Sequence, residues 1–309
     1  MVDEVVVLGQ VARDLVLRVA DVPAPLDTTA VRTRREMLGG KGANQAVALA
    51  QLGVPVSLVG VVGNDSDGAR LLDQARADGV DVSHVVFREG AQTALIVDLV
   101  DDTARWRYLE HIPADVLLTE ADVFAASSLI NRAGWVLCQL QQPLGALLLA
   151  TRLAREAGAR VILDGAPSGG EEAVADLLSR AHVLRANERE AELLTGQSIT
   201  DAATAADAAV RLLDYGPTLV VLAVSGEGNL FVSRTGKQLF PLLDTTVVDT
   251  TGAGDALIAT FTAALAHGEG TRRAAAFAVS AAAGSAARLG GRPALRWRDL
   301  ATDADTLAP

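Results

Sequence analysis

The sequence predicts an α/β fold in which a central, mostly parallel sheet is covered by helices on both faces. Short runs rich in β-branched residues are typical of buried strands, and they occur at residues 5–8, 56–62, 135–137, 161–163 and 219–223. Apolar residues recur at helical spacing at residues 44–52, 67–77, 144–157 and 202–213. This alternation of strands and helices favours a parallel sheet, whose ligand sites lie beyond the carboxyl ends of the strands.

Length and composition favour one folded domain. Half of the 309 residues are hydrophobic and 21% are charged, so the chain can bury a large core. No composition shift, internal repeat or low-complexity tract marks a second domain. We therefore expect a single domain over residues 1–309.

Charge and cysteine usage narrow the function. The net charge of -11 argues against a nucleic-acid-binding protein, which needs a basic face. Cys138 is the only cysteine, so no intrachain disulfide can form, which suits a reducing compartment. The N-terminus lacks the basic region of a signal peptide, and the longest uncharged apolar stretch, residues 274–287, is too short to cross a membrane. We expect a cytoplasmic protein with no membrane role.

Two segments depart from the strand and helix alternation, roughly residues 15–38 and 93–108. In the second, Leu95, Val97 and Leu99 recur at the two-residue spacing of a strand, as do Trp106 and Tyr108. We expect these segments to form a small sheet that acts as a lid. An ordinary edge hairpin explains the pattern equally well.

Residues 247–255 carry the first chemical pattern. A strand-like pair leads through Gly252 and Gly254 into a helix whose apolar residues recur every four positions. Free amides at the start of a helix stabilise negative charge, and glycines let a phosphoryl group approach the backbone. Asp255 falls in the first helical turn, where it can accept the proton of an attacking hydroxyl. A structural turn with a capping aspartate is the alternative interpretation, and the segment does not match a P-loop.

A second glycine-rich segment, residues 39–46, also opens a helix. Its paired glycines let a polyol pack against the backbone, and the Asn44 amide can donate to and accept from sugar hydroxyls. A dinucleotide-binding fold is the rival interpretation, but it needs a strand directly before a G-x-G-x-x-G run and an acid about 20 residues later. The spacing in this chain does not match.

The two segments together, GGKGANQA at residues 39–46 and DTTGAGD at residues 249–255, resemble the signature motifs of the ribokinase-like (phosphofructokinase-B) family of carbohydrate kinases. Residues 187–196 resemble the asparagine-x-x-glutamate element of that family, and residues 288–297 resemble the C-terminal loop of ribokinases. The resemblance covers nearly the whole chain. It implies a ribokinase-like three-layer sandwich with a small β-sheet lid.

The resemblance also implies which residues bind substrate and transfer the phosphoryl group. Asp255 matches the base that deprotonates the acceptor hydroxyl, and the backbone of Gly252, Ala253 and Gly254 matches the anion hole. The implied substrate ligands are Asp14, Gly40, Asn44, Gln141 and Asp255. We expect Lys41 to be a solvated side chain, with a substrate contact as the alternative.

ATP, Mg²⁺ and an activating monovalent cation, K⁺, are the implied cofactors. Asn187 and Glu190 match residues that hold magnesium through water, although Asn187 taken alone is better explained as a helix N-cap. The implied nucleotide-binding residues also include Val224, Gly226, Gly228 and Gly254. The implied monovalent cation site consists of Asp249, Thr251, Ser285, Arg288 and Gly290, largely through main-chain carbonyls.

The departures from the ribokinase pattern lie on the sugar side. Ala12 stands where ribokinases carry an asparagine, Gln141 where they carry a glutamate, and Leu26-Asp27 where they carry glycine-glutamate. The glycine-alanine-asparagine of the second lid strand is missing near residues 111–113. Each lost hydrogen bond to a buried hydroxyl is worth ~1 kcal/mol, so several losses together can change the preferred sugar.

The sequence therefore predicts an ATP-dependent kinase that phosphorylates a hydroxyl of ribose or a related small sugar. A nucleoside or modified-nucleoside kinase of the same fold is the alternative, with Trp106 or Tyr108 as a shelf for the base. A catalytically silent sugar or nucleotide sensor is a third reading. Ribokinases pair through their lids, so the apolar residues Leu95, Val97 and Leu99 predict a homodimer.

Overall fold

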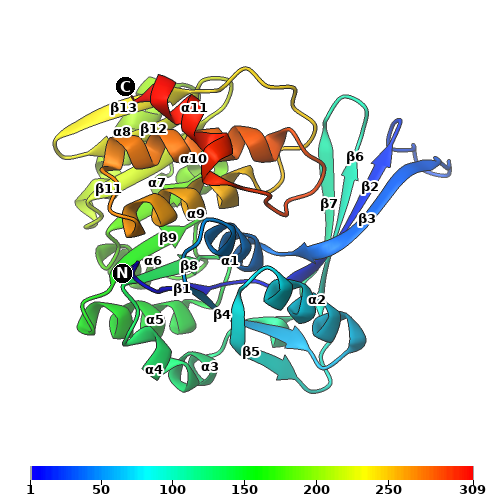
Figure 1. Ribbon diagram of the computed structural model, residues 1–309, viewed down its shortest axis with the longest axis horizontal. Coiled ribbons are helices and arrows are strands. Elements are labelled where there is room, and N and C mark those ends of the chain that lie inside the picture. The colour runs from blue at the N-terminus through cyan, green and yellow to red at the C-terminus, as the bar shows by residue number, and fades with distance from the viewer. Residues whose placement is uncertain (1, 309) are drawn as a thin grey trace.

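A nine-stranded sheet forms the centre of the protein in the computed structural model, which describes residues 2–308 (Figure 1). The strand order is β13-β12-β11-β10-β9-β8-β1-β4-β5, and every neighbouring pair is parallel except β11/β12 and β12/β13. The strands are β1 (Val5–Leu8), β4 (Val56–Gly63), β5 (Asp81–Arg88), β8 (Trp135–Gln139), β9 (Arg160–Asp164), β10 (Val183–Ala186), β11 (Leu219–Val224), β12 (Gly228–Ser233) and β13 (Gly236–Pro241). The mostly parallel sheet predicted from the sequence is confirmed.

Helices cover both faces of this sheet and divide the apolar core into two layers. One layer contains α1 (Lys41–Gln51), α2 (Ser66–Ala77), α9 (Ala253–Ala266), α10 (Thr271–Ala286) and α11 (Trp297–Leu307). The other contains α3 (Glu120–Ala125), α4 (Ser127–Ile130), α5 (Leu144–Glu156), α6 (Glu171–Ser179), α7 (Glu188–Thr195) and α8 (Ala202–Asp214), preceded by the short 3₁₀ turn η1 (Ala114–Val116). Successive residues of β1 alternate between the two cores, with Val5 and Val7 in the first and Val6 and Leu8 in the second. Burial on both faces explains why these strands are uninterrupted apolar runs.

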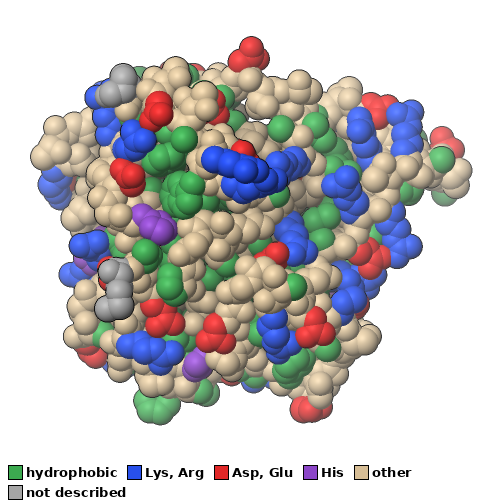
Figure 2. Space-filling view, in the orientation of Figure 1, with side chains coloured by type: hydrophobic (Ala, Val, Ile, Leu, Met, Phe, Trp, Pro, Cys, Tyr) green, Lys and Arg blue, Asp and Glu red, His purple; other side chains and the backbone are tan. Residues whose placement is uncertain are grey.

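A separate four-stranded sheet projects from the edge of the main body and forms the lid (Figure 1). Its strands, in the order β3-β2-β6-β7, are β2 (Ala12–Val19), β3 (Val31–Gly39), β6 (Ala94–Val100) and β7 (Trp106–His111). Since side chains alternate along a strand, Asp14 and Asp98 share the buried inner face, whereas Leu95, Val97 and Leu99 point to the outer face. Basic side chains lie over the projecting strands β2 and β3 in the view of Figure 2.

Helix α1 begins three residues earlier than the sequence pattern indicated. Gly40 caps it with a φ of 85°, and a Cβ there would lie 2.7 Å from the Gln10 carbonyl oxygen. The tight turn requires a glycine and brings the helix directly from strand β3. Among residues 2–308, no helix is long and apolar enough to cross a bilayer.

Candidate active site

The glycine turn before α9 packs against the C-terminal loop. Gly252 caps the helix with a φ of 73°, in the left-handed region that favours glycine. A Cβ on Gly252 would lie only 2.2 Å from the Gly291 carbonyl oxygen, so the two loops touch through their backbones. The first amides of α9 have no side-chain cap and lie at the positive end of the helix dipole. This turn can therefore bind an anion.

Asp255 lies in the first turn of α9 and is held by two residues of α1. Asn44 Nδ2 donates to Asp255 Oδ2 at 3.1 Å, and Gln45 Nε2 donates to Asp255 Oδ1 at 3.0 Å. The Asp255 side chain is 6% exposed, and burial together with the Asp164 charge raises its pKa to about 6, although Lys41, Asn44 and Arg185 act in the opposite direction. A carboxyl group with this pKa is ionised at pH 7 and is a stronger base than an ordinary aspartate. The two predicted motifs thus meet at a single carboxylate.

This pKa predicts an acid limb in the pH dependence of turnover. Because a base must be deprotonated to accept the hydroxyl proton, kcat/KM for the acceptor should fall about tenfold per pH unit below about pH 6. Asn44→Leu removes a donor that stabilises the ionised form of Asp255, so the midpoint of the acid limb should move to higher pH. The same substitution should also lower activity. A pH profile of kcat/KM for both proteins checks this, and an unshifted midpoint in the variant would speak against Asp255 as the titrating base.

A buried polar chain continues from Asp255 to strands β9 and β10. Gln45 Nε2 also donates to Asp164 Oδ2 at 2.7 Å, and Arg185 Nη1 donates to Asp164 Oδ1 at 3.1 Å. The sequence interpretation did not identify Gln45, Asp164 or Arg185 as site residues. A signal was present, because Asp164 and Arg185 are paired in register at the carboxyl ends of neighbouring parallel strands, at the edge where ligand sites form.

Asn187 and Glu190 form a reciprocal capping box at the start of α7. The Glu190 amide donates to Asn187 Oδ1, and the Asn187 amide donates to Glu190 Oε2, both at 2.8 Å. Lys41 Nζ lies 3.0 Å from the other oxygen, Glu190 Oε1. The expectation that Lys41 is solvated is therefore wrong, since the start of α1 places its ammonium group within the site. Charges on Asp164, Glu190 and Asp255 raise the Lys41 pKa against the effect of burial.

Asp14 lies over the glycine pair that precedes α1. A Cβ on Gly39 would fall 1.9 Å from Asp14 Cγ, so only a glycine leaves room for this carboxyl group. Burial and the charges of Asp98, Asp255 and Asp249 raise the pKa of Asp14 to about 8. Asp14 Oδ1 and Asn44 Oδ1 are buried acceptors without a hydrogen-bond partner among the described residues. Both atoms are therefore free to accept hydrogen bonds from a ligand.

The raised pKa of Asp14 predicts how stability depends on pH. A carboxyl group with a higher pKa in the folded than in the unfolded state binds more protons when folded, so stability falls as pH rises from about 4 to about 8. Asp14→Asn removes this charge and should raise the Tm of the unliganded protein by roughly 2 °C or more at pH 8, with little change at pH 4. Thermal unfolding at the two pH values checks this, and an equal shift at both would contradict it.

Asp98 is a lid residue of the site that the sequence interpretation missed. It is 2% exposed, accepts a hydrogen bond from Thr251 Oγ1 at 3.1 Å through Oδ2, and has no partner for Oδ1 among the described residues. Burial and the Asp249 charge raise its pKa to about 7. An isolated aspartate within an apolar strand of the lid gave no motif that could have identified it.

The lid strand β7 also contacts the turn before α9. Tyr108 Oη lies 2.6 Å from Thr251 Oγ1, and Trp106 Nε1 donates to Thr250 Oγ1 at 3.0 Å. The two aromatic rings stack with their centroids 4.4 Å apart. The lid is thus closed over the glycine turn, and both aromatic side chains are already engaged.

The residues implied as monovalent cation ligands lie together where two loops meet. Asp249 accepts hydrogen bonds from the Thr251 amide at 2.9 Å and from the Gly290 amide at 2.8 Å. The Asp249 amide donates to the Ala286 carbonyl, and the Arg288 amide donates to the Ser285 carbonyl. The Arg288 side chain turns away and donates to the Ala294 carbonyl.

The remaining implied residues lie at the carboxyl ends of the strands. Val224 ends β11, and Gly226 and Gly228 form the turn to β12 with φ angles of 73° and 149°. The Ser225 amide of this turn donates to the Glu188 carboxylate at the start of α7. Gln141 follows β8 and is exposed, so it lies open to solvent at the end of the strand.

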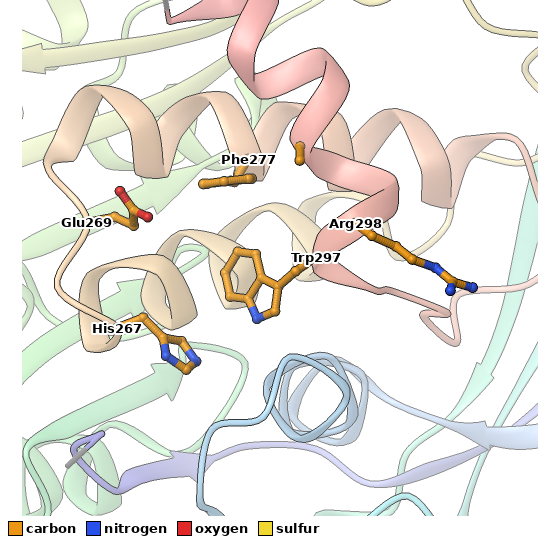
Figure 3. A pocket seen from close by; sticks show the side chains of 6 residues that line it. His267, Glu269, Phe277, Trp297 and Arg298 are labelled. Atoms are coloured by element: carbon orange, nitrogen blue, oxygen red, sulfur yellow. The ribbon is translucent and has the colours of Figure 1, made fainter.

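A hollow of about 460 Å³ lies apart from this cluster, between α10, α11 and the C-terminal end of α9 (Figure 3). Its lining includes His267, Phe277 and Trp297, and the Trp297 ring contacts each of the other two edge to face. His267, the C-cap of α9, lies twelve positions after Asp255, which corresponds to roughly 18 Å along the helix. The indole of Trp297 donates to the Leu52 carbonyl at 2.9 Å, so these side chains anchor α11 to the core.

Comparisons with known proteins agree with this arrangement. The family model described as pfkB family carbohydrate kinase matches residues 2–298. A ribokinase from Haemophilus influenzae is 31% identical over 94% of this chain and 95% of its own length. The chain spans about half the length of a bifunctional ribokinase/ribose-5-phosphate isomerase A from Fructilactobacillus sanfranciscensis, which is 32% identical over 82% of this chain and 47% of that protein.

Solved structures agree on the fold. The crystal structure of ribokinase from Thermotoga maritima superimposes with a TM-score of 0.81 and 25% identity, over 99% of this chain and 100% of that one. The family model and the full-length sequence similarity establish the relationship independently of the fold. The chain belongs to the pfkB family of carbohydrate kinases.

Proposed function

We propose that this carbohydrate kinase transfers the γ-phosphoryl group of ATP to a hydroxyl of ribose or a related unphosphorylated sugar. The observation that carries the proposal is Asp255, a buried carboxylate in the first turn of α9 that is hydrogen-bonded by Asn44 of the sugar-side motif. A hydroxyl that contacts Asn44 would therefore also reach the base. Amides at the start of α9 would stabilise the charge that builds on the phosphoryl oxygens during an in-line transfer.

The nucleotide phosphates would lie between the start of α9 and the capping box at Asn187 and Glu190. Both Glu190 oxygens already accept hydrogen bonds, one from Lys41 and one from the Asn187 amide, so Glu190 would hold a magnesium ion through water and not directly. Carbonyl groups around Asp249, Ser285 and Arg288 fit a monovalent cation, K⁺, which would hold the two loops in place. Magnesium would neutralise part of the negative charge on the nucleotide phosphates.

The chemistry of the acceptor pocket favours a ligand rich in hydrogen-bond donors. Asp14 Oδ1, Asn44 Oδ1 and Asp98 Oδ1 are buried acceptors that lack a partner among the described residues. Sugar hydroxyls donate to such atoms, so the pocket suits an acceptor with several free hydroxyl groups. Trp106 and Tyr108 bind Thr250 and Thr251 through polar atoms at their ring edges, and Trp106 remains 46% exposed, so a nucleoside acceptor stays the alternative.

A sugar screen in a coupled ADP-release assay, with and without potassium, tests this function. We expect turnover that depends on an unphosphorylated sugar and that increases with potassium. Equal ADP release with and without every sugar would contradict the proposal. Turnover that is unaffected by potassium would contradict only the cation site.

The outer face of the lid supports a homodimer. Leu95, Val97 and Leu99 lie on this face, and Leu109 on the neighbouring strand is 62% exposed. Covering apolar side chains of an exposed sheet is a common basis for two-fold association. We expect light scattering to give a dimer and Leu109→Glu to convert it to a monomer. A monomeric wild-type protein would contradict this assembly.

A further inference from the structure

The side chain of Arg185 occupies the space beside the anion hole. It is the penultimate residue of strand β10, is 8% exposed, and lies with its guanidinium against the backbone of Gly254. A Cβ on Gly254 would be 2.4 Å from Nη2 and 2.7 Å from Cζ and Nη1 of Arg185. The absence of a side chain at Gly254 is therefore what lets this cation reach the turn.

The guanidinium keeps unused donors at this position. Nη1 donates to Asp164 Oδ1 at 3.1 Å and lies 3.9 Å from Glu190 Oε2. Nε is buried without a partner among the described residues. Because a planar guanidinium can bind a phosphate with two parallel hydrogen bonds, a buried arginine with a free donor fits a phosphoryl ligand.

Charged side chains hold Arg185 at this position. Arg185 and Lys41 flank Glu190, and both lie close to the amino-terminal end of the fourteen-residue helix α9. The Asp255 carboxylate in the first turn of α9 attracts both cations, as do Asp164 and Glu190. A phosphoryl group at the start of α9 would lie within reach of both the guanidinium and the helix amides.

We propose that Arg185 is a catalytic residue that binds the phosphoryl group during transfer, an inference that rests on the proposed kinase function. The acceptor oxygen forms a bond to the γ-phosphorus while the bond from that phosphorus to the β,γ-bridging oxygen breaks. Asp255 takes the acceptor proton, and ADP leaves with the bonding electron pair. Arg185 donates hydrogen bonds to the non-bridging oxygens of the moving group, where charge is concentrated.

Nucleotide affinities separate this role from a purely structural one. We expect Arg185→Lys to weaken binding of MgAMP-PNP at least about tenfold relative to wild type, while MgADP binding changes about twofold or less, because only AMP-PNP carries a group at the γ position. Turnover should fall with little change in KM for the sugar. Calorimetric titration of both nucleotides gives the affinity ratio.

Two further variants complete the experiment. Arg185→Met combined with Asp164→Asn removes the cation without leaving a buried carboxylate unpaired, and it should show the same loss of the AMP-PNP preference. Arg189→Gln, an exposed arginine on α7, is the matched control and should bind both nucleotides as the wild type does. If the double variant does not fold, Arg185→Lys carries the test alone.

An unchanged ratio of the two affinities in an Arg185 variant of an active kinase would overturn this inference, since Arg185 would then only position Asp255 through Asp164 and Gln45. A wild-type protein that phosphorylates no sugar would instead contradict the proposed function.

Discussion

Asp255→Asn is expected to lower kcat by a factor of about 10²–10⁴ while leaving nucleotide and sugar affinity close to wild type. The amide has nearly the same shape, its oxygen can accept from Gln45, and a flip of the Asn44 amide lets Asn44 Oδ1 accept from the new NH2 group, but the amide cannot accept the hydroxyl proton. Steady-state kinetics with an accepted sugar, combined with nucleotide titration, separates the loss of chemistry from a loss of binding.

Asp299→Asn is the matched control for this variant. Asp299 is also an aspartate in the first turn of a helix, α11, but it is exposed on the surface. It should leave turnover unchanged. Near-normal activity of the Asp255→Asn protein would mean that another group takes the proton, and the assignment of the site would have to be abandoned.

Gly252→Ala is expected to reduce kcat by a factor of about 10²–10³, comparable to the loss of one oxyanion-hole donor. The positive φ of 73° is strained for alanine, and the new Cβ would lie 2.2 Å from the Gly291 carbonyl oxygen. The two loops must separate, which displaces the amides that face the phosphoryl group and disturbs the carbonyls around Asp249. Steady-state kinetics measures the effect.

Gly284→Ala gives the matched control, because Gly284 lies within α10 and a Cβ there meets no atom within 4 Å. This substitution should leave turnover unchanged and raise stability by about 0.5–1 kcal/mol through the better helix propensity of alanine. Equal activities of the two variants would show that the Gly252 turn does not shape the anion hole.

The phosphate-binding side of the site could be predicted from the sequence because its residues lie close together along the chain. The residues from Gly252 to Asp255 are contiguous, and their turn and first helical turn follow from glycine conformation and helix geometry alone. Asn187 and Glu190 are three residues apart, so both their capping geometry and their shared position were predictable.

The hydrogen-bond partners of these residues could not be predicted, because they are distant in sequence and meet the site residues only through tertiary packing. Gln45 reaches Asp255 across 210 positions of sequence, and Asp98 reaches Thr251 across 153 positions. Lys41 was misjudged for the same reason, since its partner Glu190 lies 149 positions away. Single polar residues such as Asp98 and Arg185 carry no motif, and only the register of their strands reveals that they face the site.

The residues around the sugar acceptor show how these unpredicted contacts affect sugar specificity. Ala12 is buried in β2 and provides no polar side chain, whereas Asp98 adds a carboxylate on the lid that a sequence pattern did not indicate. The pocket therefore contains a carboxylate that the sequence pattern did not predict, in addition to the losses that it did predict. The preferred sugar will follow from both.

The most direct test of the central claim is transfer of label from γ-labelled ATP to a sugar. Wild-type protein with magnesium, potassium and a panel of unphosphorylated pentoses and hexoses should form a labelled phosphate ester in amounts equal to the ADP released. Release of label only as inorganic phosphate, with no labelled sugar from any member of the panel, would contradict the account.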